Sequence, residues 1–428
     1  MRGGEESLIF KSSPRFRIPI VLVQRNIAET NLNCYYFLRM SKVSTGLDIL
    51  LRSDLARFKD SRVGILSHQA SVDSRLSHII SLLHAQSIQI TALFAPEHGL
   101  WGTAQDQIPI LSDDEPVLNV PIFSLYGNHR TPPAESLKQI DLLICDLQDV
   151  GSRYYTFIWT MAIAMQACAK QGKKFIVLDR PNPINGLTME GPVLDINYAS
   201  FVGLYPLPVR HGMTIGEIAL WLNDRFSMGA DLEVIRMKGW KRKMYFEQTG
   251  LTWVLPSPNM PTVDTAVVYP GACLIEGTNL SEGRGTTRPF EILGAPYVDG
   301  DRLAGLLNRD KLPGVIFRAC RFEPTFHKFQ KDSCRGVQIH VTDRRTFFPF
   351  LTALVLIQRV YDLYNGQFAW RPPPYEYETE KLPFDILCGT DAIRKSIEAG
   401  QPVQRLQDAW REDCAGFAKE RKPFLLYN

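Results

Sequence analysis

The sequence predicts an α/β fold, in which a parallel-sheet domain is followed by a smaller α+β C-terminal domain. Three short apolar runs rich in branched residues are typical of buried parallel strands: Ile90–Ala95, Leu142–Cys145 and Phe175–Leu178. Helical patterns separate these runs, so the repeated unit is a strand, a helix and the next strand, joined by right-handed crossovers. The first domain is therefore expected to be Rossmann-like.

Further elements extend this domain, which we predict to span residues 45–239. Val63–Leu66 is expected to be the first strand, and Ser71 is a candidate N-cap for the helix that follows it. A capping box that begins at Thr214 predicts another helix, and Leu232–Met237 is expected to be one more strand. Strands and helices thus alternate over the whole first domain.

The second half of the chain, residues 240–428, has a different pattern. Val315–Phe322 and Val337–Val341 are predicted strands, and the latter alternates strictly between apolar and polar residues. Phe347–Tyr364 is predicted to be a strongly apolar helix. These elements together indicate an α+β domain.

Residues 1–39 fit neither domain. Their apolar stretch, Ile18–Val23, is too short for a signal-peptide core or a membrane span. We expect this segment to be a disordered extension or the product of an upstream start site, because Met40 opens the segment MSKVSTGLDILL. No credible signal peptide is present, so the N-terminal segment alone favours a cytoplasmic location, and the location of the protein stays open.

Composition argues against several classes of function. The chain has 428 residues and a formal charge of +3 without a dense Lys/Arg block, so nucleic acid is not an expected partner. Its 8 cysteines are scattered without zinc-site spacing, so no metal site is expected. No apolar run is long enough for a transmembrane segment. Neither a GxGxxG fingerprint nor a Walker-type loop is present, which argues against a nucleotide cofactor.

Carboxylates follow the predicted strands directly. Glu97, Asp146, Asp149 and Asp179 should gather at one edge of the sheet, because the carboxyl ends of parallel strands meet there. Open α/β sheets bind their ligands outside this edge. Several acids around one crevice indicate an active site.

Glu97 is the candidate general acid. It follows Pro96 at the end of a predicted buried strand, where an apolar wall favours the neutral carboxyl that a general acid requires. A salt-bridged or loop-ordering glutamate would produce the same pattern. The next residue, His98, is a candidate to orient Glu97 or to bind substrate.

Other candidates in the first domain have both a functional and a structural interpretation. Asp149 precedes a predicted tight turn, so it is a candidate second carboxylate or a helix cap. Arg153 would pair with an acid, and Tyr154 would form a wall for a sugar ring or simply pack. Asn182 lies in a proline-stiffened loop that suits polar recognition and an ordinary rigid turn equally.

A polar loop of the second domain, Ile275–Pro296, is a candidate ligand loop. It is rich in Gly, Thr and charged residues and has little apolar periodicity. We expect it to form the far wall of the crevice. Its candidate site residues are Glu276, Thr278, Asn279, Glu282 and Arg284.

Longer motifs resemble a known family. FAPEHG, DLQDVGSRYYTF, LDRPNPING with MEGPVLD, PVRHGMTIGE, PSPNMP and IEGTNLSEGRGTTRPFE resemble the motifs of the YbbC/NamZ family of exo-β-N-acetylmuramidases. These enzymes are glycoside hydrolases of peptidoglycan turnover. The resemblance runs from about Gly46 to the closing KPFLLY, which is nearly all of the chain after the N-terminal extension.

The resemblance implies an active cleft between a Rossmann-like domain and a smaller C-terminal domain. It places the catalytic glutamate at Glu97 and implies release of terminal β-linked N-acetylmuramic acid (MurNAc) from MurNAc–GlcNAc fragments, without a cofactor. The second catalytic group stays open among Asp146, Asp149, Asp179, Glu276 and Glu282, and the acetamide of the sugar could itself be the nucleophile. Cationic candidates for the lactyl carboxylate of muramic acid are Arg153, Arg210 and Arg284.

Two other functions are compatible with the same residues. The chain could bind peptidoglycan fragments without cleaving them. It could also be a nucleotide-dependent Rossmann enzyme, although the missing phosphate-binding glycines argue against this.

Overall fold

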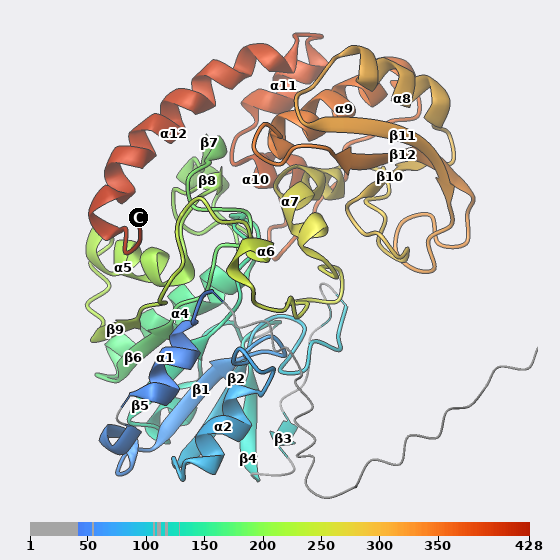
Figure 1. Cartoon of the computed structure of the whole chain (residues 1–428). Helices are drawn as coiled ribbons and strands as arrows, with labels where there is room; N and C mark the ends of the chain where they lie inside the picture. The colour runs from blue at the N-terminus through green and yellow to red at the C-terminus, as the bar shows by residue number, and fades with distance from the viewer. Residues whose placement is uncertain (1–41, 54, 106–107, 109–112, 116–118, 128) are drawn as a thin grey trace, which may run out of the picture. The chain divides into compact units, whose positions relative to one another are not determined.

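A seven-stranded sheet forms the framework of the N-terminal part of the chain (Figure 1). The computed structural model describes residues 42–53, 55–105, 108, 113–115, 119–127 and 129–428, and the strand count refers to these residues. The strands are β1 Val63–Ser67, β2 Ile90–Ala95, β3 Asp113–Glu115, β4 Val120–Ser124, β5 Leu142–Asp146, β6 Lys174–Leu178 and β9 Leu232–Ile235. The predicted extension, residues 1–39, lies outside the described residues.

The order of the strands identifies the fold. Across the sheet they run β3–β4–β2–β1–β5–β6–β9. The strands from β4 to β9 pair in parallel, and β3 pairs antiparallel to β4 at one edge. Without β3, the parallel strands are arranged as the third, second, first, fourth, fifth and sixth along the chain, which is the Rossmann order. The predicted Rossmann-like parallel sheet is confirmed.

Alternate strand residues pack on opposite faces of the sheet. Leu66 and Phe94 belong to the main hydrophobic core, on the face covered by α3, α4 and α5. Ile65 and Leu93 belong to a second core, on the face covered by α1 and α2. Burial on both faces explains why these strands are continuously apolar. The helices are α1 Gly46–Arg52, α2 Ile79–Ala85, α3 Ala134–Lys138, α4 Phe157–Lys170 and α5 Ile215–Arg225.

The two predicted helix caps have different outcomes. Thr214 caps α5 through a capping box, as predicted. The prediction for Ser71 is wrong, because α2 begins only after His78, which is its N-cap. Leu76 adopts a φ of 67°, which interrupts any helical path between these two residues. The Ser71 hydroxyl instead donates a 2.5 Å hydrogen bond to the backbone oxygen of Asp146.

The C-terminal part is built on a smaller antiparallel sheet with helices, which confirms the predicted α+β organisation. Its strands lie in the order β10–β12–β11, and β12 pairs antiparallel with both neighbours. Their bounds are β10 Ile292–Ala295, β11 Val315–Phe322 and β12 Cys334–Val341. The helices are α7 Val263–Ala272, α8 Gly300–Arg309, α9 Pro349–Tyr364, α10 Pro383–Cys388, α11 Ala392–Glu398 and α12 Gln407–Arg421.

The end of the chain returns to the first sheet. Figure 1 shows α12 running from the C-terminal part back to α5. There the indole N–H of Trp221 donates to Glu420 at 3.0 Å, and the Tyr427 hydroxyl donates to Asp179 at 2.6 Å. Of three further short elements, β7 Glu190–Val193 and β8 Pro208–Arg210 lie between β6 and β9 in sequence, and α6 Phe246–Thr249 lies between β9 and β10. The last residues therefore complete the packing around the Rossmann-like sheet.

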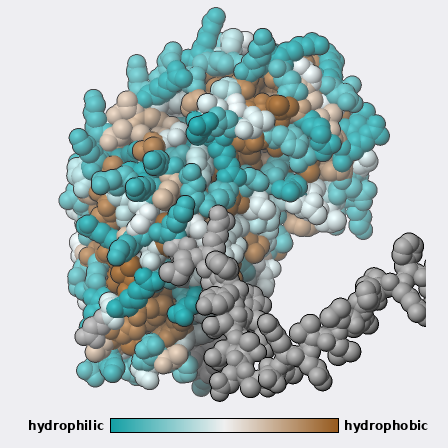
Figure 2. Space-filling model, in the orientation of Figure 1, coloured by the Kyte–Doolittle hydropathy of each residue, from teal (hydrophilic) through white to brown (hydrophobic). Residues whose placement is uncertain are grey.

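The surface is consistent with this buried core. The face shown in Figure 2 is largely hydrophilic, with hydrophobic residues gathered in a few places. Among the described helices, none combines the length and the apolar character that a membrane crossing requires.

Candidate active site

One pocket at the carboxyl end of β2 is lined by residues from both parts of the chain. It lies at the sheet edge where open α/β folds bind ligands. Its lining residues are Glu97, His98, Tyr154, Tyr155, Thr156, Val202, Ser257, Asn259, Met260, Tyr269, Glu276, Arg284, Phe290, Tyr375 and Glu376.

Glu97 reaches the pocket from the loop that follows β2. The residue is 7% exposed, and its Oε2 accepts a 2.9 Å hydrogen bond from the Thr156 hydroxyl. Because Thr156 is the N-cap residue of α4, the start of a helix orients the carboxyl. The next residue, His98, adopts a φ of 71°, and its Nδ1 lies 3.0 Å from the carbonyl oxygen of Ala104. Such backbone conformations are uncommon outside glycine and concentrate at functional sites.

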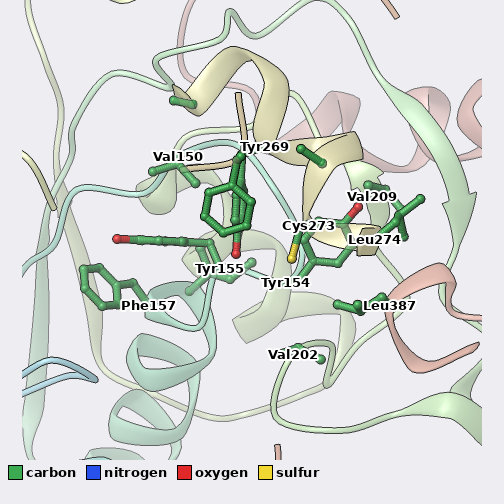
Figure 3. Close-up of a cluster of buried hydrophobic side chains, with 14 of the residues drawn as sticks. Val150, Tyr154, Tyr155, Phe157, Val202, Val209, Tyr269, Cys273, Leu274 and Leu387 are labelled. Carbon is green, nitrogen blue, oxygen red and sulfur yellow. The ribbon is translucent and has the colours of Figure 1, made fainter. Parts of the chain in front are cut away.

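Three tyrosines form an aromatic wall (Figure 3). The ring of Tyr269 packs edge to face against those of Tyr154 and Tyr155, with centroids 6.0 and 6.1 Å apart. Burial raises the pKa of all three phenols well above its ordinary value, so the wall is uncharged. Tyr154 was expected either to form a wall for a sugar ring or simply to pack. Its side chain does both, since it lines the pocket and packs in the main hydrophobic core.

The same pocket also carries a guanidinium between two carboxylates. Arg284 lies 2.8 Å from Glu276 and 3.4 Å from Glu282, and its Cζ lies 5.0 Å from the centre of the Phe290 ring. The other oxygen of Glu276 accepts a 2.7 Å hydrogen bond from the Tyr375 hydroxyl. The loop 275–296 thus brings Glu276 and Arg284 into the same pocket as Glu97.

Glu282 lies behind Arg284 and does not line the pocket. It is buried, and its two oxygens lie 3.1 Å from Nδ1 of His327 and 3.0 Å from Nζ of Lys328. Burial opposes ionisation of Glu282, but Lys328, the His327 hydrogen bond and Arg284 together hold its pKa well below the usual range. Glu282 is therefore a fixed negative charge that anchors Arg284.

Glu376 is a pocket carboxylate that the sequence reasoning missed. The hydroxyl of Tyr126 donates to both of its oxygens, at 3.1 and 3.3 Å. In the sequence, the feature that could have indicated Glu376 as a site residue is its position directly after the Pro-rich loop 371–375. Ser257 and Asn259 also line the pocket, and both lie in the PSPNMP motif.

The other predicted acids lie outside the pocket lining because structural partners engage them. Asp146 makes a two-point ion pair with Arg180, at 2.5 and 2.7 Å. Asp149 accepts from the backbone of the following turn at 2.8 Å and lies 3.3 Å from the ring of His211. Asp179 accepts hydrogen bonds at the start of α5, and burial raises its pKa to about 7. These three carboxylates hold the sheet edge together.

Five other predicted binding residues are also absent from the lining. Each donates a hydrogen bond to a backbone carbonyl: Arg153, Asn182, Arg210, Thr278 and Asn279. Arg153 shows the pattern most fully, since its buried guanidinium donates to the carbonyls of Pro192, Leu207 and Leu387. These side chains connect loops whose carbonyls would otherwise be buried without a donor.

The arrangement defines a class of protein. Glu97, Glu276 and Glu376 share one pocket with an aromatic wall and a guanidinium, at the ligand-binding edge of a Rossmann-like sheet. Paired carboxyl groups in one pocket are the machinery of a glycoside hydrolase.

The particular family follows from comparison with known proteins. Residues 63–264 match the N-terminal model, and residues 267–427 the C-terminal model, of the exo-β-N-acetylmuramidase NamZ. The chain belongs to this family, as its motifs indicated.

Individual relatives agree with this assignment. The peptidoglycan β-N-acetylmuramidase NamZ of Bacillus subtilis (strain 168) is 48% identical over 389 residues, which cover 90% of this chain and 92% of the relative. Two crystal structures of DUF1343 family proteins from Bacteroides fragilis have TM-scores of 0.82 and 0.70 at 35% and 30% identity. Each match covers 90% of this chain and 99% of the other.

Proposed function

We propose that this protein is an exo-acting β-N-acetylmuramidase that releases terminal β-linked MurNAc from peptidoglycan fragments. The observation that carries the proposal is the convergence of Glu97 with further carboxylates and Arg284 in one pocket, in a chain 48% identical to a peptidoglycan β-N-acetylmuramidase.

Glu97 acts as the general acid in this proposal. Cleavage of a glycosidic bond requires a carboxylic acid that gives its proton to the leaving oxygen. Glu97 is nearly buried at the sheet edge, and the Thr156 hydroxyl holds one of its oxygens, so the carboxyl has a defined direction. Preorganisation of this kind is what allows a side chain to act on a bond within hydrogen-bond reach.

Arg284 recognises the lactyl carboxylate that distinguishes muramic acid from N-acetylglucosamine. Its guanidinium lines the pocket, and two carboxylates, Glu276 and Glu282, fix the plane of that group. Charge-assisted hydrogen bonds from a held guanidinium are strong and directional. The uncharged wall of Tyr154, Tyr155 and Tyr269 lies in the same pocket and would contact the sugar ring.

Product analysis tests the function. The purified protein should release MurNAc from MurNAc–GlcNAc and leave GlcNAc–MurNAc intact, as followed by mass spectrometry. Glu97→Gln should reduce turnover on the disaccharide by at least about a hundredfold, the scale of losing a general acid. Glu135→Gln is the matched control, because that glutamate lies exposed on α3. Binding of the disaccharide without any release of product would instead indicate a non-catalytic binding protein.

A further inference from the structure

We infer that Glu376 is the second catalytic carboxylate of this pocket, acting on the anomeric centre while Glu97 acts on the leaving oxygen. The inference rests on the proposed function and extends it. Glu97 gives its proton to the glycosidic oxygen as the bond between C1 and that oxygen breaks, with both electrons going to the oxygen. The Glu376 carboxylate offsets the positive charge left on C1 and the ring oxygen. Water then supplies the hydroxyl to C1 and the proton that restores Glu97.

Adjacent strands place the two carboxylates around one phenol. In the parallel pair of β2 and β4, Ala95 is in register with Ser124, and the pairing continues with a hydrogen bond from the N–H of Leu125 to Ala95. Glu97 and Tyr126 therefore occupy equivalent positions, two residues beyond the matched pair. Tyr126 then donates its hydroxyl to the carboxylate of Glu376, which reaches this point from the C-terminal part of the chain.

The electrostatics of Tyr126 agree with this placement. Burial raises the pKa of its phenol far above the ordinary value, and the negative charges of Glu97 and Glu376 raise it further. Both carboxylates therefore act electrostatically on the same hydroxyl. A phenol held neutral in this way keeps the proton that it donates to Glu376.

The segment that carries Glu376 is anchored on both sides. On one side, the Tyr375 hydroxyl donates to Glu276 at 2.7 Å. On the other, the Tyr377 hydroxyl accepts from the N–H of Gly127 at 2.9 Å, and the Arg130 guanidinium lies 4.4 Å from the Tyr377 ring centre. Such anchoring limits the movement of the carboxylate between its neighbours.

The backbone of this segment is also strained. Glu376 and Tyr377 have φ values of 46° and 69°, in the left-handed region that non-glycine residues seldom adopt. Conformations of this kind persist only where surrounding contacts hold them, and they cluster at active sites. The strain presents the carboxylate to the pocket, where Glu376 is 9% exposed.

Glu276 has a different role. Its charge is balanced by the guanidinium of Arg284, and its second oxygen is occupied by the Tyr375 hydroxyl. The Tyr126 phenol donates to both oxygens of Glu376 and orients this carboxylate within the pocket. In a pocket this buried, a carboxylate is weakly screened by water, so it can stabilise a developing cation. Glu276 is therefore a positioning residue for Arg284, and Tyr126 is one for Glu376.

The test separates the two carboxyl roles by leaving group. Substrates are MurNAc–GlcNAc and an aryl β-MurNAc glycoside with an activated phenol. Glu97→Gln should lose much more activity on the disaccharide than on the aryl glycoside, because an activated phenol leaves without protonation. Glu376→Gln should lose about a hundredfold or more on both, because both reactions pass through the same cation. The acidic limb of the pH–rate profile, which reports ionisation of the second carboxylate, should disappear in Glu376→Gln.

Two further variants distinguish catalysis from structure. Tyr126→Phe should lower kcat more than it raises KM, because the carboxylate remains but is less well oriented. Glu276→Gln should weaken binding of free MurNAc, whereas Glu376→Gln should bind it as the wild type does and unfold at the same temperature. The inference is overturned if Glu376→Gln keeps most of its activity on the aryl glycoside, or if its loss depends on the leaving group as that of Glu97→Gln does. A wild-type protein inactive on both substrates would contradict the proposed function instead.

Discussion

Replacing Asp146 by Asn should destabilise the fold and leave the chemistry intact. Asp146 is fully buried and Arg180 is 5% exposed, and two charged hydrogen bonds of 2.5 and 2.7 Å join them. The Asn variant removes the negative charge and leaves the guanidinium buried without its counter-ion. Removal of one partner from a buried ion pair costs roughly 3–5 kcal/mol. We expect about 3 kcal/mol, because the Asn oxygen still accepts one hydrogen bond.

The assay is urea unfolding combined with turnover. A loss of about 3 kcal/mol changes the folding equilibrium by about two powers of ten. With an m-value of about 3 kcal/mol/M, the unfolding midpoint falls by about 1 M urea. Asp141→Asn is the matched control, since Asp141 also pairs with an arginine through two oxygens but is 43% exposed. Water screens that pair, so its midpoint should move far less.

Turnover decides between the two interpretations of Asp146. Under conditions where the variant is folded, Asp146→Asn should keep the wild-type kcat, because Asp146 is not part of the pocket lining. A variant as stable as the wild type but without activity would refute this reasoning and return Asp146 to the catalytic candidates.

Two other predictions concern charge. Burial raises the pKa of Glu190 to about 7. The folded chain therefore binds the proton of this carboxyl more tightly than the unfolded chain does. The stability that the bound proton contributes is complete below about pH 4.5 and is lost as the pH rises to about 7. Glu190→Gln should reduce that decline in the free energy of unfolding, to which Asp179 with its pKa of about 7 also contributes, and an unchanged decline would exclude Glu190 as a source. Arg284→Ala should weaken inhibition by free MurNAc at least about tenfold more than inhibition by GlcNAc, which lacks the carboxylate. Equal losses for both sugars would rule out recognition of charge by Arg284.

The sequence by itself determined the elements whose causes are local. Short, continuous apolar runs rich in branched residues are typical of strands buried on both faces of a sheet, so β2, β5 and β6 were identified with nearly the observed bounds. The capping box at Thr214 is a contact between neighbours in sequence, and it forms as predicted. Glu97 could be found for the same reason, because its place depends on the strand that it directly follows.

Tertiary structure decided which carboxylates face the pocket. Glu97 and Asp146 both follow parallel strands, and nothing local distinguishes them. Arg180 engages Asp146 from another strand end, while Glu97 stays at the pocket. Ser71 fails as a helix cap for a related reason, since its hydroxyl finds an acceptor at the end of β5. Glu376 is far from Glu97 in sequence but lines the same pocket, where it accepts a hydrogen bond from the Tyr126 hydroxyl. Such pairings depend on residues distant in sequence, whose approach is fixed only when the whole chain packs.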